Sequence, residues 1–237
     1  MTGLVSTLRQ VALRHGMAVF GVADLEFVRP HLACISPEIG AEYIRALVLG
    51  YPLHRSVIET VTNQPTAIYF HHYRQVNYAL DRAGLEVAMC IEKGGFRALA
   101  IPASQYVSRN PMRGHISHRL LGWAAGLGWI GRSTLLVHPG YGSQVRYASI
   151  LTDAPFPAGT PLEGNCGLCR RCIEACPAGA IKEDSTNFGL ALCTAKLTEF
   201  SKLPHIGQHI CGVCVKACPA PLRNRRESRA GAVDRGR

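Results

Sequence analysis

Eight cysteines crowd into one stretch of the chain, between positions 166 and 218, and they constrain the fold more than any other feature. They form two runs, each of which closes in a Cys-Pro pair. The first run is Cys166, Cys169, Cys172 and Cys176, and the second is Cys193, Cys211, Cys214 and Cys218. Cysteines in the spacing C-x2-C-x2-C-x3-C-P are typical of chains that hold [4Fe–4S] clusters. We therefore predict two such clusters.

The first run has the spacing of bacterial ferredoxins, in which three closely spaced sulfurs bind one cluster and the fourth binds the other. Carried over residue by residue, this crossed ligation divides the eight cysteines into two sets. The first set is Cys166, Cys169, Cys172 and Cys218, and the second set is Cys176, Cys193, Cys211 and Cys214. Each run would thus donate one ligand to the cluster of the other run.

Two other uses of the cysteines compete with this interpretation. Structural zinc sites usually combine paired C-x2-C motifs, whereas the first run adds a third cysteine after only two more residues. Disulfide frameworks belong to secreted proteins, and residues 1–10 lack a basic flank followed by an apolar segment. We therefore expect no export signal and a cytoplasmic protein with reduced cysteines. Two iron–sulfur clusters are the favoured interpretation, and zinc is the main alternative.

Of the formal charge of +10, residues 221–237 contribute +4, because they hold six arginines against Glu227 and Asp234. We interpret residues 223–237 as a basic, disordered tail. An acidic partner or nucleic acid is the alternative, although the rest of the chain shows no comparable basic patch. Apolar runs such as residues 46–49 are too short to span a bilayer, so no membrane association is expected.

The part of the chain before the cysteines mixes the two hydrophobic periodicities of helices and strands. Helices are predicted at 4–15, at 71–93 and after Ser117, and strands at 17–23, 44–50, 96–101, 133–138 and 144–152. The turn residues 139–142 predict that the last two strands form a hairpin. Prolines between 155 and 161 suggest a boundary. We expect an α+β domain over 1–157, which holds a cofactor or substrate, and a double-cluster domain over 158–222.

A glycine-rich segment, Gly126-Leu127-Gly128-Trp129-Ile130-Gly131-Arg132, follows the third predicted helix. Closely spaced glycines allow the backbone to approach a flat or large ligand. They equally allow a tight turn from a helix to a strand. The G-x-G-x-x-G pattern does not decide between these, because a dinucleotide fingerprint would follow a strand.

Residues 124–183 resemble epoxyqueuosine reductases, through the segment 125–132, Gly142-Ser143, Ile150-Leu151-Thr152-Asp153 and the run from Cys166 to Ile181. These enzymes belong to the same broad group as corrinoid-dependent reductive dehalogenases, and a looser resemblance covers residues 4–222. The resemblance implies an α+β domain similar to nitroreductases and cobalamin-processing proteins, followed by a bacterial-ferredoxin-like domain. It also implies a cobamide whose cobalt the clusters reduce, and an electron donor such as a flavodoxin or ferredoxin. The implied cobamide-binding residues are Gly126, Gly128, Trp129, Ile130, Gly131 and Arg132. Flavin is the rival cofactor.

The chain departs from this family in two places. The family has an acidic residue, its proposed proton donor, where this chain reads Ile101-Pro102-Ala103-Ser104. The resemblance also implies a tRNA-binding helical repeat after the clusters, and we expect the arginine-rich tail to stand in its place. His118 is the first candidate for a substitute donor, because imidazole titrates near neutral pH, and His115 and Tyr106 follow.

The sequence therefore predicts an iron–sulfur reductase that passes electrons through a corrinoid to an unknown small substrate. One alternative is a ferredoxin-like electron carrier that serves a separate corrinoid enzyme. The other is an epoxyqueuosine reductase that acts on tRNA.

Overall fold

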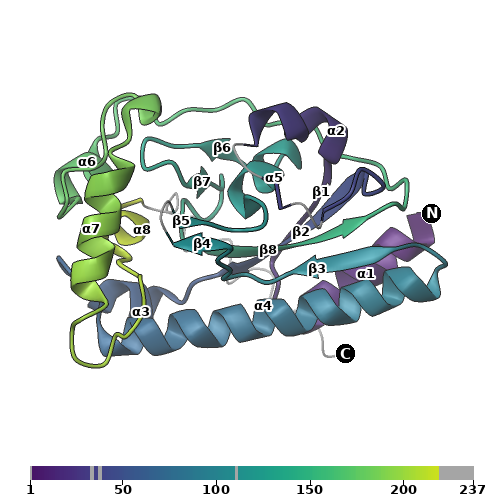
Figure 1. Cartoon of the computed structure of the whole chain (residues 1–237), viewed down its shortest axis with the longest axis horizontal. Helices are drawn as coiled ribbons and strands as arrows, with labels where there is room; N and C mark the ends of the chain where they lie inside the picture. The colour runs from purple at the N-terminus through teal and green to yellow at the C-terminus, as the bar shows by residue number, and fades with distance from the viewer. Residues whose placement is uncertain (1, 33–34, 37–38, 110–111, 219–237) are drawn as a thin grey trace, which may run out of the picture.

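The computed structural model of the chain describes residues 2–32, 35–36, 39–109 and 112–218, so the predicted tail at 223–237 lies outside the described residues. A four-stranded antiparallel sheet forms its centre, in the order β1-β2-β8-β3 (Figure 1). The strands are β1 (Val19–Asp24), β2 (Arg45–Pro52), β8 (Val145–Thr152) and β3 (Ala98–Ile101). The two central strands are almost continuously apolar, which is why both of their faces can be buried.

The two faces of the sheet carry two separate groups of buried side chains. Leu47 and Leu49 of β2 pack toward α1 (Thr2–Arg14) and α4 (Ala67–Lys93). Ala46 and Val48 of the same strand pack toward α2 (Leu25–Val28) and α5 (His118–Ala124). This division follows from the alternation of side chains along a strand. The sheet is thus covered by helices on both faces.

The long helix α4 runs along one face of the sheet and beyond its edge (Figure 1). Thr66 caps it by accepting a hydrogen bond from the backbone N–H of Tyr69, and Gly94 closes it. The helix predicted at 71–93 is therefore confirmed, although it begins earlier, at Ala67. Polar residues recur along α4, and no helix in the described part of the chain is long and apolar enough to cross a membrane.

The predicted hairpin of residues 133–138 and 144–152 is wrong. The turn closes only a single bridge between His138 and Gly142. Strand β7 (Leu136–Val137) pairs instead with β6 (Trp129–Ile130), and β8 inserts between β2 and β3. The apolar character of β8 suits the centre of a sheet, where two neighbouring strands satisfy its backbone hydrogen bonds.

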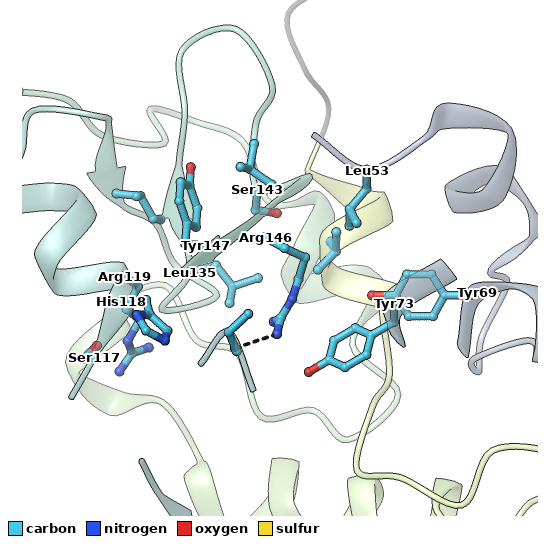
Figure 2. A pocket seen from close by; sticks show the side chains of 14 residues that line it. Leu53, Tyr69, Tyr73, Ser117, His118, Arg119, Leu135, Ser143, Arg146 and Tyr147 are labelled. Carbon is cyan, nitrogen blue, oxygen red and sulfur yellow. Dashed lines mark hydrogen bonds between the residues drawn. The ribbon is translucent and has the colours of Figure 1, made fainter. Parts of the chain in front are cut away.

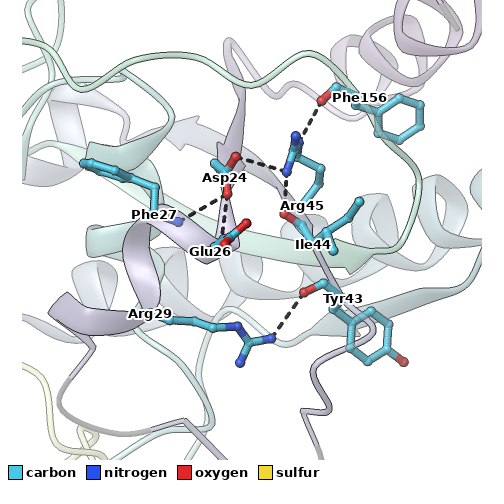
Figure 3. A network of polar contacts seen from close by, with 8 residues as sticks. All are labelled: Asp24, Glu26, Phe27, Arg29, Tyr43, Ile44, Arg45 and Phe156. Atoms are coloured by element: carbon cyan, nitrogen blue, oxygen red, sulfur yellow. Dashed lines mark hydrogen bonds and ion pairs between the residues drawn. The ribbon is translucent and has the colours of Figure 1, made fainter.

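A polar network fixes the end of the sheet from which the chain departs toward the cysteines (Figure 3). Asp24 caps α2 by accepting hydrogen bonds from the backbone N–H groups of Glu26 and Phe27. Its other carboxylate oxygen lies 3.1 Å from Nη1 of Arg45. Nε of Arg45 donates to the carbonyl oxygen of Phe156 at 2.9 Å. One arginine thus joins β1, β2 and the segment that follows β8.

The cysteine-rich part of the chain packs against the end of α4 that lies nearest α3 (Figure 1). The remaining elements are η1 (Arg29–His31), α3 (Arg55–Thr60), β4 (Ser108–Arg109), β5 (Met112–Arg113), α6 (Arg171–Ala175), η2 (Ser185–Asn187), α7 (Leu190–Phe200) and α8 (Val213–Ala217). Ile206, Ile210 and Val213 belong to the same buried group as Ile58 and Tyr69. The two parts therefore share apolar packing, and the predicted boundary after residue 157 stays a prediction.

Candidate functional site

The first set of cysteines comes together at the contact between α6 and α8. Burial raises the pKa of Cys172, and the neighbouring thiols Cys166, Cys218 and Cys169 raise it further. Burial also raises the pKa of Cys218, against hydrogen bonding from Ser143, which lowers it. The fold therefore places Cys218 beside three cysteines that precede it by more than forty positions in the sequence.

The second set surrounds a cavity of about 370 Å³ with largely apolar walls. Its four thiols, Cys176, Cys193, Cys211 and Cys214, all line this space. Burial raises the pKa of Cys211 to about 11, and the pKa of Cys214 rises further for the same reason. Thiols enclosed in this way become good ligands only when a metal takes the place of their protons. The cavity and its soft sulfur donors thus fit an iron–sulfur cluster.

The spacing of the thiols bears on the kind of metal site. Across the described residues, no group of three or more His, Cys, Asp or Glu side chains is arranged to hold a single metal ion. A structural zinc site needs four ligands within about 2.0–2.3 Å of one ion. A [4Fe–4S] cluster is larger, because each of its four thiolates binds a different iron.

Arg132 binds the loop that carries the first cysteines of the first set. Its Nη1 donates to the carbonyl oxygen of Cys169, and its Nη2 donates to that of Gly167, both at 2.9 Å. Its Nε lies 3.2 Å from the carboxylate of Glu183, which also pairs with Arg170 at 2.6 Å. The resemblance implied a cobamide contact for Arg132, whereas the structure directs its side chain to the cysteine loop.

We expect Arg132→Gln to release iron roughly tenfold faster than the wild type, because two charge-assisted hydrogen bonds to the loop are lost. The measurement is the rate of iron release to a coloured chelator under anaerobic conditions. Arg170→Gln is the matched control, since Arg170 shares Glu183 but makes no hydrogen bond to the loop carbonyls in the described structure. Equal rates in both variants would show that these hydrogen bonds do not retain the metal.

A second cavity has a volume of about 290 Å³ (Figure 2). It lies next to the thiol-lined one. Arg119 and Leu135 line both. Its walls come from strand β8, helices α4, α5 and α8, and the segment after β3. Tyr69, on one wall, is close enough to Cys214 and Cys211 for both thiols to act on its hydroxyl, whose pKa is raised chiefly by burial. We call this space the arginine cavity, after Arg119 and Arg146, which both line it.

His118, the predicted proton donor, lines the arginine cavity, but both of its ring nitrogens are occupied. Nε2 lies 2.9 Å from the carbonyl oxygen of Pro102, and Nδ1 lies 2.9 Å from Oγ of Ser149. Nε2 also lies 3.0 Å from the amide Nε2 of Gln105, so this ring nitrogen faces both an acceptor and a donor, and each tautomer satisfies one of these two contacts. Burial lowers the pKa of His118 to about 4, so the ring is neutral at pH 7. This geometry favours a role in orienting the loop after β3. His115 and the exposed Tyr106 are not among the described residues that line the cavity.

The low pKa of His118 predicts a specific pH dependence. Unfolding restores the ordinary pKa of 6.5. Between pH 6.5 and about 4, the imidazole of His118 is therefore protonated in the unfolded chain and neutral in the folded chain. The stability contributed by neutral His118 is therefore complete above pH 6.5 and is lost as the pH falls toward 4. We estimate about 2 kcal/mol for the whole interval, allowing for partial exposure of the ring.

The check compares apparent melting temperatures of the wild type, His118→Gln and His71→Gln between pH 7.5 and 5. His71 is an exposed histidine of α4 and serves as the control. The gap between the wild type and His118→Gln should narrow as the pH falls, because only the wild type loses this contribution. A gap that is independent of pH would contradict the assignment.

The glycine-rich segment forms a tight turn, and its glycines face the protein itself. A Cβ at Gly126 would lie 2.4 Å from the carbonyl oxygen of Thr160, and one at Gly128 would lie 2.1 Å from that of Val137. At Gly131 it would lie 3.2 Å from Sγ of Cys166. Backbone packing therefore explains these glycines without a ligand. Trp129 and Ile130 instead line a separate open hollow of about 660 Å³.

Neither the arginine cavity nor the thiol cavity is by itself large enough to enclose a cobamide. Clefts of about 300–1,000 Å³ enclose drug-sized ligands, and a cobamide is larger than these. The arginine cavity and the thiol cavity measure about 290 and 370 Å³. Cobamide binding at residues 126–132 stays a prediction.

The polar side chains at the arginine cavity were not predicted from the sequence. Tyr69 and Tyr73 line the cavity, and Asn77 accepts hydrogen bonds from Arg146. These three residues recur every four positions along α4, a spacing that places them on one helical face. Arg146 lies in a strand that otherwise consists mostly of buried residues. An arginine within a strand of buried residues is the sequence signal that could have indicated a polar cavity at this place.

Comparison with known proteins places this architecture in a defined structural class. No family model matches the chain. A solved B12-dependent reductive dehalogenase aligns over 94% of this chain and 32% of its own, at 19% identity and a TM-score of 0.72. Epoxyqueuosine reductase from Streptococcus thermophilus aligns over 90% of this chain and 65% of its own, at 17% identity and a TM-score of 0.61. The chain thus has the α+β fold that these two kinds of protein share.

Sequence similarity points more narrowly to one of them. Epoxyqueuosine reductase of Gloeobacter violaceus is 32% identical over 172 residues, which is 68% of this chain and 51% of the relative. That of Bacillus anthracis is 35% identical over 114 residues, which is 45% of this chain and 30% of the relative. The chain spans about half or less of the length of these relatives. The predicted resemblance to epoxyqueuosine reductases is confirmed.

Proposed function

We propose that the chain is an iron–sulfur reductase that passes electrons from two [4Fe–4S] clusters to a substrate in the arginine cavity. The observation that carries this proposal is the wall of Arg119 and Leu135 that the arginine cavity shares with the cavity of the second cysteine set. Electron transfer to a substrate requires a binding site close to a cluster. A pure electron carrier needs no such cavity.

The residues around the arginine cavity would bind, orient and shield the substrate. The clusters, when bound, would supply single electrons. Leu53, Leu136 and Val145 give the cavity apolar walls that limit access of water. Burial raises the pKa of Tyr147, so its hydroxyl keeps its proton and can donate a hydrogen bond. His118 holds the loop after β3, which contributes Ala103 to the wall.

Redox titration tests this function. Anaerobic protein should show a broad visible absorption that bleaches as it takes up about two electrons per chain, one for each cluster. Absence of bleaching by a strong reductant would contradict the proposal.

We further propose, from the family resemblance, that a corrinoid accepts these electrons. Its test is titration with cob(II)alamin, where a spectral shift at micromolar protein is expected for a ligand bound by about −8 kcal/mol.

Action on tRNA is the second candidate, and the names of the curated relatives favour it. The family's acidic position corresponds to the segment around Ala103, which does line the arginine cavity. In this chain no carboxylate stands there, and the nearby Asp81 is engaged in accepting a hydrogen bond from the backbone N–H of Ala103 at 2.8 Å. A small-molecule substrate therefore fits the site better than the epoxyqueuosine chemistry that depends on this acid.

A further inference from the structure

Two guanidinium groups line the arginine cavity without a carboxylate partner. Nε and Nη2 of Arg146 both donate to Oδ1 of Asn77, at 3.2 and 3.1 Å, and Nη2 also donates to the carbonyl oxygen of Ala103 at 3.0 Å. Arg119 donates from Nη1 to the carbonyl oxygen of Thr134. All of these acceptors are neutral. Within the described residues, neither arginine forms an ion pair.

Arg146 is held rigidly although its charge is not neutralised. Its guanidinium also lies over the ring of Tyr73, 4.3 Å from the ring centre. Together with the bonds to Asn77 and Ala103, this contact fixes the plane of the group. Nη1 makes no hydrogen bond to any described residue and stays available to a ligand. A pre-oriented guanidinium suits bidentate or paired recognition of an oxyanion.

The surroundings of Arg146 are consistent with a missing negative charge. Burial lowers the pKa of the Arg119 guanidinium, and the charge of Arg146 contributes to lowering the pKa of His118 after the effect of burial. Arg119 and Arg146 bring two positive charges to the wall of this cavity. A bound anion would offset the free-energy cost of holding unpaired positive charges there, because charges in partly buried sites are stable when paired.

The rest of the cavity restricts the kind of anion. Its other walls include Leu135, Leu136 and Val215, which offer contact to an apolar body. The hydroxyl of Tyr147 is buried and has no hydrogen-bond partner among the described residues, so it offers one further donor. A volume of about 290 Å³ is of the size that admits a small organic acid.

We propose that the arginine cavity binds a small organic anion, with its carboxylate against Arg146 and Arg119 and its apolar body against Leu135 and Leu136. This inference deepens the proposed function, because it identifies the substrate class of the same site. Binding of the anion itself does not require electron transfer. The two claims can therefore fail separately.

Calorimetric titration of the anaerobic holoprotein with benzoate tests the inference, with benzamide as the neutral isostere and inorganic phosphate as the anion without an apolar body. Benzoate should bind at least tenfold more tightly than either. Arg146→Gln should weaken benzoate binding roughly 10- to 100-fold, since a charge-assisted contact is lost. Arg74→Gln, on the exposed side of α4, should leave it unchanged.

Arg119→Gln provides a second test if Arg146→Gln fails to fold. This variant is expected to fold, because Arg119 is more exposed than Arg146 and makes only one hydrogen bond in the described structure. It should weaken benzoate binding several-fold. Equal binding of benzoate and benzamide, tighter binding of phosphate, or unchanged binding in both arginine variants would overturn the inference. Normal benzoate binding without bleaching in the redox titration would overturn the proposed reductase and leave the anion site intact.

Discussion

Cys176→Ser is expected to remove about four of eight irons per chain and to spare the cluster of the first set. Cys176 lies in the first run of cysteines, yet it lines the cavity of the second set. It also acts electrostatically on Cys193, Cys211 and Cys214, after the larger effect of their burial. The measurement is iron content together with the electron paramagnetic resonance spectrum of the reduced protein, in which one of two signals should vanish.

Cys90→Ser is the control for this variant, because Cys90 lies on α4 and belongs to neither set. Its iron content should equal that of the wild type. Loss of the signal that also disappears in Cys169→Ser would contradict crossed ligation. Since metal binding and folding are coupled in small cluster-binding segments, reduced solubility of Cys176→Ser is also expected.

Gly126→Ala is expected to destabilise the fold by at least about 3 kcal/mol. The residue has a φ of +74°, which costs a non-glycine residue about 1–2 kcal/mol. The added Cβ would also lie 2.4 Å from the carbonyl oxygen of Thr160, and two backbone segments cannot easily separate. Thermal unfolding with cluster absorption as the signal measures the effect.

Gly95→Ala is the matched control. Gly95 has a φ of +85°, and a Cβ there would meet nothing within 4 Å, so only the conformational cost applies. The difference between the two variants therefore isolates the clash with Thr160. If Gly126→Ala folded as well as Gly95→Ala and lost only corrinoid binding, the glycine would serve the cofactor, as the family resemblance implied.

The strands and the long helix could be predicted because their periodicity is local. Residues 44–50 and 144–152 read as buried strands, and they are β2 and β8. Their pairing could not be predicted in this way, because Pro139 and Gly140 indicated a hairpin while the true neighbours of β8 are distant in sequence. Turn chemistry constrains a few residues, whereas burial of an apolar strand on both faces needs the whole sheet.

The cysteine sets could be proposed from spacing, because thiolate geometry around a cluster restricts the sequence directly. The arginine cavity could not, since it depends on tertiary contacts. The sequence around Arg146 does not reveal that its guanidinium contacts Tyr73, Asn77 and Ala103. These three residues come from α4 and the loop after β3, which are distant in sequence. His118 was predicted as an acid from its ordinary pKa, but burial changes that pKa and its neighbours occupy both nitrogens.

Metal analysis of anaerobically purified protein tests the central claim most directly. Iron, acid-labile sulfide and zinc are measured in the same sample and divided by the protein concentration. We predict about eight irons and eight sulfides per chain and only traces of zinc. Stoichiometric zinc, with no sulfide and no visible charge-transfer absorption, would contradict it.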